Sequence, residues 1–96
     1  MHDEHGSTDL VHFELPRFVD VGGLVARLGD RCPVAVITEG DIWIVTAVVS
    51  GGDELGRVLR EVEGYIGEVD LLAIRFCVDG RYYVMNNPPR TRSEAA

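Results

Sequence analysis

The sequence predicts a small α+β domain in which two helices cover one face of an antiparallel sheet. The chain has 96 residues, a length that suits one domain. Segments rich in β-branched residues alternate with two segments of helical periodicity. Two pairs of strand segments are each separated by two residues that include a glycine, as in β-hairpins.

An N-terminal strand and a first helix are predicted from two different periodicities. Residues 10–15 (LVHFEL) alternate apolar and polar side chains, which is the period of a strand with one buried face. Residues 20–29 (DVGGLVARLG) space their apolar side chains for one helical face. Asp20 stands in the N-cap position of this helix and Gly29 in its C-cap position.

A hairpin is predicted next. Residues 33–38 (PVAVIT) and 41–50 (DIWIVTAVVS) are β-branched runs, and the dipeptide 39–40 (EG) forms the predicted turn between them. That turn sets Val36 opposite Trp43. Because the second strand is apolar on both sides, it is expected to be covered on both faces.

The longest helix is predicted over residues 53–67. Its apolar residues recur at intervals of three and four, which places them in one stripe with charged residues on the opposite side. Ser50 and Asp53 are predicted to form a capping box at its start, and Gly67 to end it. The stripe consists of Leu55, Val58, Leu59, Val62 and Ile66.

A second hairpin completes the predicted fold. Residues 71–78 (LLAIRFCV) and 81–86 (RYYVMN) flank the dipeptide 79–80 (DG), a strong hairpin signal. The order is then βαββαβ with an extra C-terminal strand, which is that of a ferredoxin-like two-layer sandwich. The alternative is two αββ units in a rough internal repeat. The register of this hairpin turns five residues toward the helices: Leu72, Ile74, Phe76, Tyr83 and Met85.

The sheet face away from the helices is predicted to carry apolar side chains. Such a stripe implies a covering, by a second subunit, a partner, a ligand or a tail. The alternative is that the first hairpin belongs to a three-layer or curled sheet and is simply core. Trp43 and Tyr82 are the preferred interface anchors, because aromatic residues dominate interface energetics. The predicted interface residues are Trp43, Tyr82, Val36, Val45 and Val84.

Charge and composition exclude several classes of function. The formal net charge is −7, which argues against binding to nucleic acid or to anionic membranes. The chain contains no Lys, so Schiff-base chemistry is excluded. Cys32 and Cys77 form no CxxC motif and are predicted to be free, buried thiols. Without a signal peptide or an apolar run of about 18–20 residues, the protein is expected to be cytoplasmic.

Two polar tails are predicted to flank a single domain. Residues 1–9 and 87–96 have little apolar content and are expected to be disordered, leaving residues 10–86 as the domain. The first tail contains residue types that ligate metals, namely His2, Asp3, Glu4 and His5. Because no rigid element is predicted there to organise them, neither a metal site nor a cofactor is expected.

Two short segments resemble parts of known families. Residues 51–55 (GGDEL) resemble the signature loop of diguanylate cyclases. In that family the motif lies in a hairpin of a longer domain, whereas here a turn and a helix start explain it. Residues 22–28 (GGLVARL) resemble the start of an ACT ligand-binding domain, where a glycine turn approaches a bound amino acid. The second resemblance implies a small ligand near Gly22 and Gly23.

A group of polar residues is predicted to gather on the open sheet face if the first strand pairs beside the fourth. The group comprises His12, Glu14, Arg75, Cys77 and Tyr82. His, Cys and Glu are residue types of acid–base and nucleophilic catalysis, but their spacing here is not diagnostic. Ordinary cross-strand pairing is the simpler explanation. The candidate ligand-binding residues are Gly22, Gly23, His12, Arg75 and Cys77.

The expected function is that of a non-catalytic interaction or regulatory domain. We expect it to self-associate or to bind a protein partner through the apolar sheet face. One alternative is a small-molecule sensor, with a ligand beside the Gly22–Gly23 turn. The other is a small dimeric αβ-barrel enzyme that uses His12, Glu14 or Arg75. No binding to nucleic acid or membrane is expected.

Overall fold

The computed structural model describes residues 8–87, which form five strands and two α-helices. The predicted tails therefore lie largely outside the described residues. Thr8 and Asp9 are an exception, because the first strand begins at Thr8. The elements are β1 (Thr8–Leu15), the 3₁₀-helix η1 (Phe18–Asp20), α1 (Val21–Gly29), β2 (Val34–Glu39), β3 (Ile42–Ser50), α2 (Gly51–Glu68), β4 (Ala73–Val78) and β5 (Arg81–Asn86).

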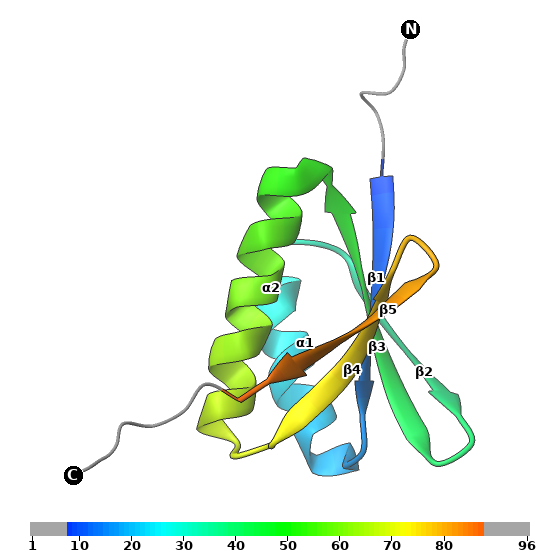
Figure 1. Ribbon diagram of the computed structural model, residues 1–96, viewed down its shortest axis with the longest axis vertical. Coiled ribbons are helices and arrows are strands. Elements are labelled where there is room, and N and C mark those ends of the chain that lie inside the picture. Colours follow the sequence, from blue (N-terminus) through cyan, green and yellow to red (C-terminus); the bar gives the residue numbers. More distant parts are fainter. Residues whose placement is uncertain (1–7, 88–96) are drawn as a thin grey trace, which may run out of the picture.

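The five strands form one antiparallel sheet in the order β2-β3-β1-β4-β5. Both helices lie on the same side of this sheet (Figure 1). The predicted α+β class, with an antiparallel sheet and two helices, is therefore confirmed. The N-terminal strand β1 occupies the centre, between β3 and β4, so the condition for gathering the predicted polar group is met.

The core lies between the helices and the central strands. In β1, Val11, Phe13 and Leu15 are fully buried, because alternate residues of a strand point to the same face. The predicted stripe of α2 faces this core, and Tyr65 joins it. From α1 the buried residues are Val21, Leu24 and Leu28.

The starts of both helices differ from the prediction. The Asp20 carboxylate makes no capping bond to the backbone of α1 and instead pairs with Arg17. At α2 no Ser50–Asp53 capping box forms. The Ser50 N–H donates to Glu54 Oε1 at 2.6 Å, and the helix begins earlier than predicted, at Gly51. The carboxylate thus still sits at the positive end of the helix, but one residue later.

The two hairpins use different turns. In the second, Asp79 and Gly80 both have positive φ, and the predicted register is confirmed. In the first, the turn residues are Gly40 and Asp41, and only Gly40 has positive φ. The predicted turn at 39–40, and with it the pairing of Val36 with Trp43, is wrong: Val36 pairs with Val45. A turn with glycine first and negative φ second is the II′ type, which explains the shift of one residue.

The entry to β4 also corrects the prediction. The strand begins at Ala73, because Leu71 N–H bonds to Ile66 O and closes the end of α2. Asp70 adopts a left-handed φ of 63° in this connection. Leu71 is buried as a result, whereas Leu72, predicted to face the core, is exposed.

Two further expectations concern membrane-spanning helices and the state of the two cysteines. Neither helix within residues 8–87 is long and apolar enough to cross a membrane. Cys32 and Cys77 are both free, as predicted. Cys32 is buried, but Cys77 is only half-buried because it points to the open side of the sheet.

Candidate functional site

The sheet face opposite the helices is the candidate site, and we call it the open face. The register aligns one residue from each strand across it: Ala35, Thr46, His12, Cys77 and Tyr82. The next row contains Ile37, Ile44, Glu14, Arg75 and Val84. The strand order therefore brings together residues that are far apart in the chain.

An ion pair lies at the centre of the open face. Arg75 donates from Nε to Glu14 Oε1 at 3.0 Å and from Nη2 to Glu14 Oε2 at 3.1 Å. The guanidinium also lies over the ring of Tyr82, 4.4 Å from its centroid. Hydrogen bonding to Glu14 raises the pKa of Arg75, so the guanidinium stays charged at neutral pH. Both charges are thus satisfied within the chain.

His12 is also held by a neighbour on this face. Its Nδ1 shares a hydrogen bond of 2.9 Å with Thr46 Oγ1. His12 pairs with Cys77 in the β1–β4 register, but within the described part of the chain no hydrogen bond joins the two. They do not form the bonded nucleophile–base pair that covalent catalysis requires. Residues 8–87 also contain no group of His, Cys, Asp and Glu arranged for a metal ion.

A shallow hollow of about 190 Å³ opens on the same face. It is smaller than the pockets of about 300 Å³ and more that usually hold small-molecule ligands. Two aliphatic side chains and several polar groups border it. The lining residues are His12, Glu14, Ile37, Glu39, Ile44, Cys77 and Tyr82.

Apolar side chains surround this polar centre. Ile37, Tyr82 and Val84 expose 52%, 59% and 62% of their surface. Leu10 and Ile42 are exposed as well. The first hairpin is therefore not internal core, and the three-layer alternative does not describe this structure. The open face has a paired polar centre and an exposed apolar rim.

The predicted interface residues are divided between the two faces. Tyr82 and Val84 lie on the open face, as predicted. Trp43, Val36 and Val45 point to the helix side, because β3 sets Trp43 and Val45 opposite Leu15 and Phe13 on the buried face of β1. Val45 is fully buried in the core, and Trp43 packs on the Phe18 ring with centroids 4.7 Å apart. The prediction that Trp43 anchors the open face is wrong.

The predicted ligand-binding residues are divided too. His12, Arg75 and Cys77 lie together on the open face. Gly22 and Gly23 lie in α1 on the helix side, so the five residues do not form one site. A side chain at Gly23 would collide with the Tyr65 hydroxyl, which explains that glycine by packing.

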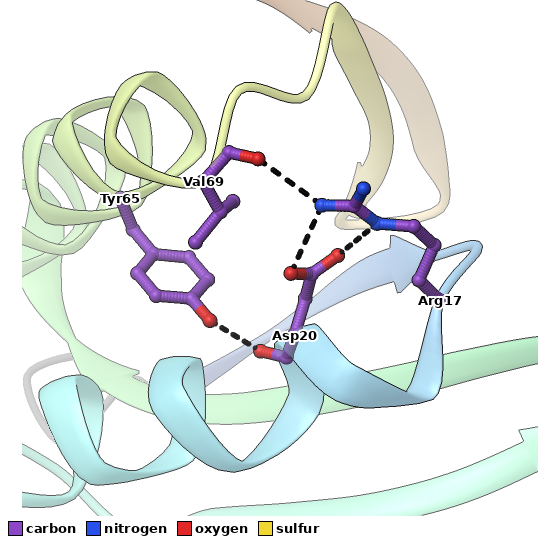
Figure 2. Close-up of polar contacts among 4 residues, drawn as sticks. All are labelled: Arg17, Asp20, Tyr65 and Val69. Atoms are coloured by element: carbon purple, nitrogen blue, oxygen red, sulfur yellow. Dashed lines mark hydrogen bonds and ion pairs between the residues drawn. The ribbon is translucent and has the colours of Figure 1, made fainter.

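A second polar cluster near Gly23 has no counterpart in the sequence prediction (Figure 2). Arg17 forms two bonds to Asp20, at 2.7 and 3.1 Å, and a third to Val69 O at 3.1 Å. Tyr65 donates its hydroxyl to Asp20 O at 2.7 Å. Burial raises the pKa of the Tyr65 phenol. These bonds join the start of α1 to the end of α2, so the cluster is explained by contacts within the chain.

Another hollow of about 190 Å³ lies on the helix side, between α2 and the second hairpin. It is lined by apolar and aromatic side chains: Leu55, Leu59, Phe76, Val78 and Tyr83. Tyr83 stacks on Phe76 within it, with centroids 5.5 Å apart. This hollow lacks the convergent polar groups that orient a ligand.

Comparison of the chain with protein-family models, with curated proteins and with solved structures finds no match.

Proposed function

We propose that this chain is a non-catalytic interaction module whose open face binds a second copy of the chain. The observation that supports it is the combination of an exposed apolar rim with a polar centre that is already paired. Burial of apolar surface contributes about 25 cal/mol per Å², whereas burial of unpaired charges opposes association. At the centre of this face the charged groups that would be covered, Glu14 and Arg75, already bond to each other, and Glu39 lies at the end of β2.

The arrangement of charge favours a second copy as the occupant. A two-fold dimer places the same patch on both sides of the interface. The open face carries adjacent opposite charges, Glu14 and Arg75, so a two-fold copy can set each charge near its opposite. The anchors proposed for this interface are Tyr82 and Val84, together with Ile37 at the far end of the same row.

Sedimentation velocity with a matched pair of variants tests this proposal. Val84→Glu places a charge on the open face, and Leu72→Glu places one on an aliphatic residue outside the strands that is more exposed still. We expect Val84→Glu to lower the sedimenting mass and Leu72→Glu to leave it unchanged. Equal masses for wild type and Val84→Glu would overturn the proposal, as would a wild type that stays monomeric at its highest soluble concentration.

A small-molecule sensor is the second candidate, and the hollow beside His12 and Cys77 is the observation that favours it. A thermal-shift screen with amino acids and nucleotides tests this function. A ligand at one hundred times its Kd should stabilise the chain by about 2.7 kcal/mol. A Cys77→Leu variant, which narrows the hollow, should abolish the shift, and a flat response across the screen would remove this candidate. The enzyme alternative, which uses His12, Glu14 or Arg75, is not proposed, because His12 bonds to Thr46 and because Glu14 and Arg75 bond to each other.

We further propose that the fold belongs to the ferredoxin-like class. What supports this is the position of β3, which pairs antiparallel with both β1 and β2 and so splits a β1–α1–β2 unit. Strand β5 is then an addition at the β4 edge.

A further inference from the structure

Strand β2 leaves one side of its backbone unpaired at the edge of the sheet. Within residues 8–87 it pairs only with β3. An edge strand presents a row of N–H and C=O groups that can pair with another chain. Which groups these are follows from the register.

The outward groups belong to three alternate residues. Val48 N–H donates to Pro33 O at 3.0 Å, so these two residues form a hydrogen-bonded pair of the antiparallel ladder. Such pairs recur at every second residue, so Ala35, Ile37 and Glu39 bond to β3. The backbone groups of Val34, Val36 and Thr38 therefore point away from the sheet.

Residues 34–38 of β2 lack the features that block an edge, and the one charged residue of the strand, Glu39, stands at its last position. Natural edges are usually protected by charged side chains, by proline or by bulges. Residues 34–38 (VAVIT) contain no charge and no proline. The register runs without interruption from Val34–Ala47 to Glu39–Ile42, so no bulge is present. Val36 is 41% exposed on one face and Ile37 is exposed on the other.

We propose that β2 pairs antiparallel with β2 of a second copy, centred on Val36. A two-fold axis perpendicular to the sheet requires paired residues to share a face. Only outward-pointing residues can bond across the seam, so Val36 meets Val36 of the second copy and Val34 meets Thr38. All three outward residues of each chain are then used, which gives six backbone hydrogen bonds, two for each residue pair. Shifting the register loses some of these bonds.

The side chains fit this register. On the open face Ala35 lies opposite Ile37 of the second copy, so a small side chain meets a large one. On the helix side Val34 lies opposite Thr38, and both are β-branched. Glu39 falls opposite Pro33, and by residue count Asp41 lies at the level of Arg31, so no like charges meet. The strand is thus compatible with itself in both size and charge, which commits the proposal to a second copy.

This interface is separate from the one proposed for the open face. Pairing through β2 joins two sheets side by side and leaves both open faces on the same side of the new sheet. Face-to-face association uses a two-fold axis perpendicular to this one. If both interfaces form and their two-fold axes intersect, they close a four-chain assembly, and removing either interface leaves a dimer.

Position-specific cross-linking tests the register. In a Cys77→Ser background we would compare Val36→Cys with Thr38→Cys, both on the exposed edge, using a short bismaleimide. In the proposed register the two Val36 positions lie about 5.5 Å apart, whereas the two Thr38 positions are offset by roughly 13 Å along the strand. We expect a covalent dimer from Val36→Cys and several-fold less from Thr38→Cys. Equal yields would overturn the proposal.

A backbone variant gives a second measurement. Val36→Pro removes the central outward N–H without touching a bond to β3, and Val36→Thr keeps that N–H as the control. We expect Val36→Pro to halve the sedimenting mass and Val36→Thr to leave the mass unchanged. A Val36→Pro mass equal to that of wild type would overturn the edge interface. Because Val84→Glu reports only on the open face, failure of one interface is distinguishable from failure of the other.

Discussion

Two arginine–carboxylate pairs of similar geometry lie on opposite sides of the sheet. The inner pair, Arg17–Asp20, and the outer pair, Glu14–Arg75, each use Nε and Nη2 of the arginine at 2.7–3.1 Å. Their surroundings differ. The Asp20 side chain is 4% exposed, and its residue also accepts the Tyr65 hydroxyl. The Glu14 side chain is 15% exposed, and its partner Arg75 is half in solvent.

Bond geometry alone therefore does not determine how much an ion pair contributes to the stability of the fold. The inner pair joins the start of α1 to the end of α2, through Arg17 to Val69 O and through Tyr65 to Asp20 O (Figure 2). The outer pair joins two strands that the sheet already holds together. Removing the inner pair therefore releases the arginine that also bonds to Val69 O, whereas removing the outer pair affects only side chains on strands that the sheet already joins. Four predictions test this comparison.

Asp20→Ala should have the largest effect. It removes two hydrogen bonds from a charged donor and leaves Arg17 without its carboxylate, although water can reach the half-exposed guanidinium. We expect a loss of about 2 kcal/mol in the free energy of unfolding, measured by urea denaturation. Glu14→Ala is the matched variant. If the two variants lose equal stability, the distinction between the pairs does not hold.

Gly23→Ala should come next, with Gly22→Ala as its control. Replacing glycine by alanine inside a helix ordinarily stabilises a protein by about 0.5–1 kcal/mol. A Cβ at Gly22 meets nothing within 4 Å, so Gly22→Ala should be neutral to stabilising. A Cβ at Gly23 would overlap the Tyr65 hydroxyl and displace it from Asp20, so we expect a loss of about 1–2 kcal/mol. If thermal unfolding gives the same change in Tm for both variants, the expected difference between the two glycines is contradicted.

Tyr65→Phe should lower the free energy of unfolding by about 1 kcal/mol, the usual contribution of one hydrogen bond. It should also change the response to alkali. Burial raises the pKa of Tyr65 in the folded chain, so above the ordinary pKa of about 10 the unfolded chain releases its proton first. The stability that this pKa difference contributes is complete below about pH 10 and is lost as the pH rises through the pKa of Tyr65 in the folded chain. Urea titrations from pH 8 to 11 should show a steeper decline for wild type than for Tyr65→Phe, and parallel declines would argue against it.

Glu14→Gln should have the smallest effect on stability. Exposed ion pairs contribute about 0–1 kcal/mol, and salt screens them. We expect the free energy of unfolding to change by less than about 0.5 kcal/mol, and this change to disappear at high salt. Urea unfolding with and without 1 M NaCl measures both effects. A salt-independent loss comparable to that of Asp20→Ala would show that the outer pair supports the fold.

The sequence predicted the second hairpin better than the first because the two turns place glycine differently. Asp79 and Gly80 both have positive φ, as a dipeptide of that kind favours, so the register followed. The first turn contains one glycine with an acidic residue on each side, Glu39 and Asp41, and composition alone did not decide which side completes it. That choice gave Val36 the wrong partner, but Val36 and Trp43 share a face in either register. Trp43 was misplaced because the sequence does not show which face of this hairpin the helices cover.

The residues of the open face were predictable in part. Once β1 lies beside β4, the alternation of strands places His12, Arg75 and Cys77 on one face. The cluster around Asp20 was missed because the contact between the Tyr65 hydroxyl and Asp20 O spans 45 residues and has no local signal. Asp20 looked like a helix cap, and only the packing of α1 on α2 shows its other use.

The central position of β1 has a consequence for the order of synthesis. β1 leaves the ribosome before the other strands of this sheet, yet its two neighbours come much later: His12 bonds to a residue 34 positions on, and Glu14 to one 61 positions on. Until β4 is made, Phe13 lacks the Phe76 ring that it packs against. Contacts this distant in sequence slow folding. The nascent chain therefore carries an apolar strand without its final partners until most of the domain has been translated.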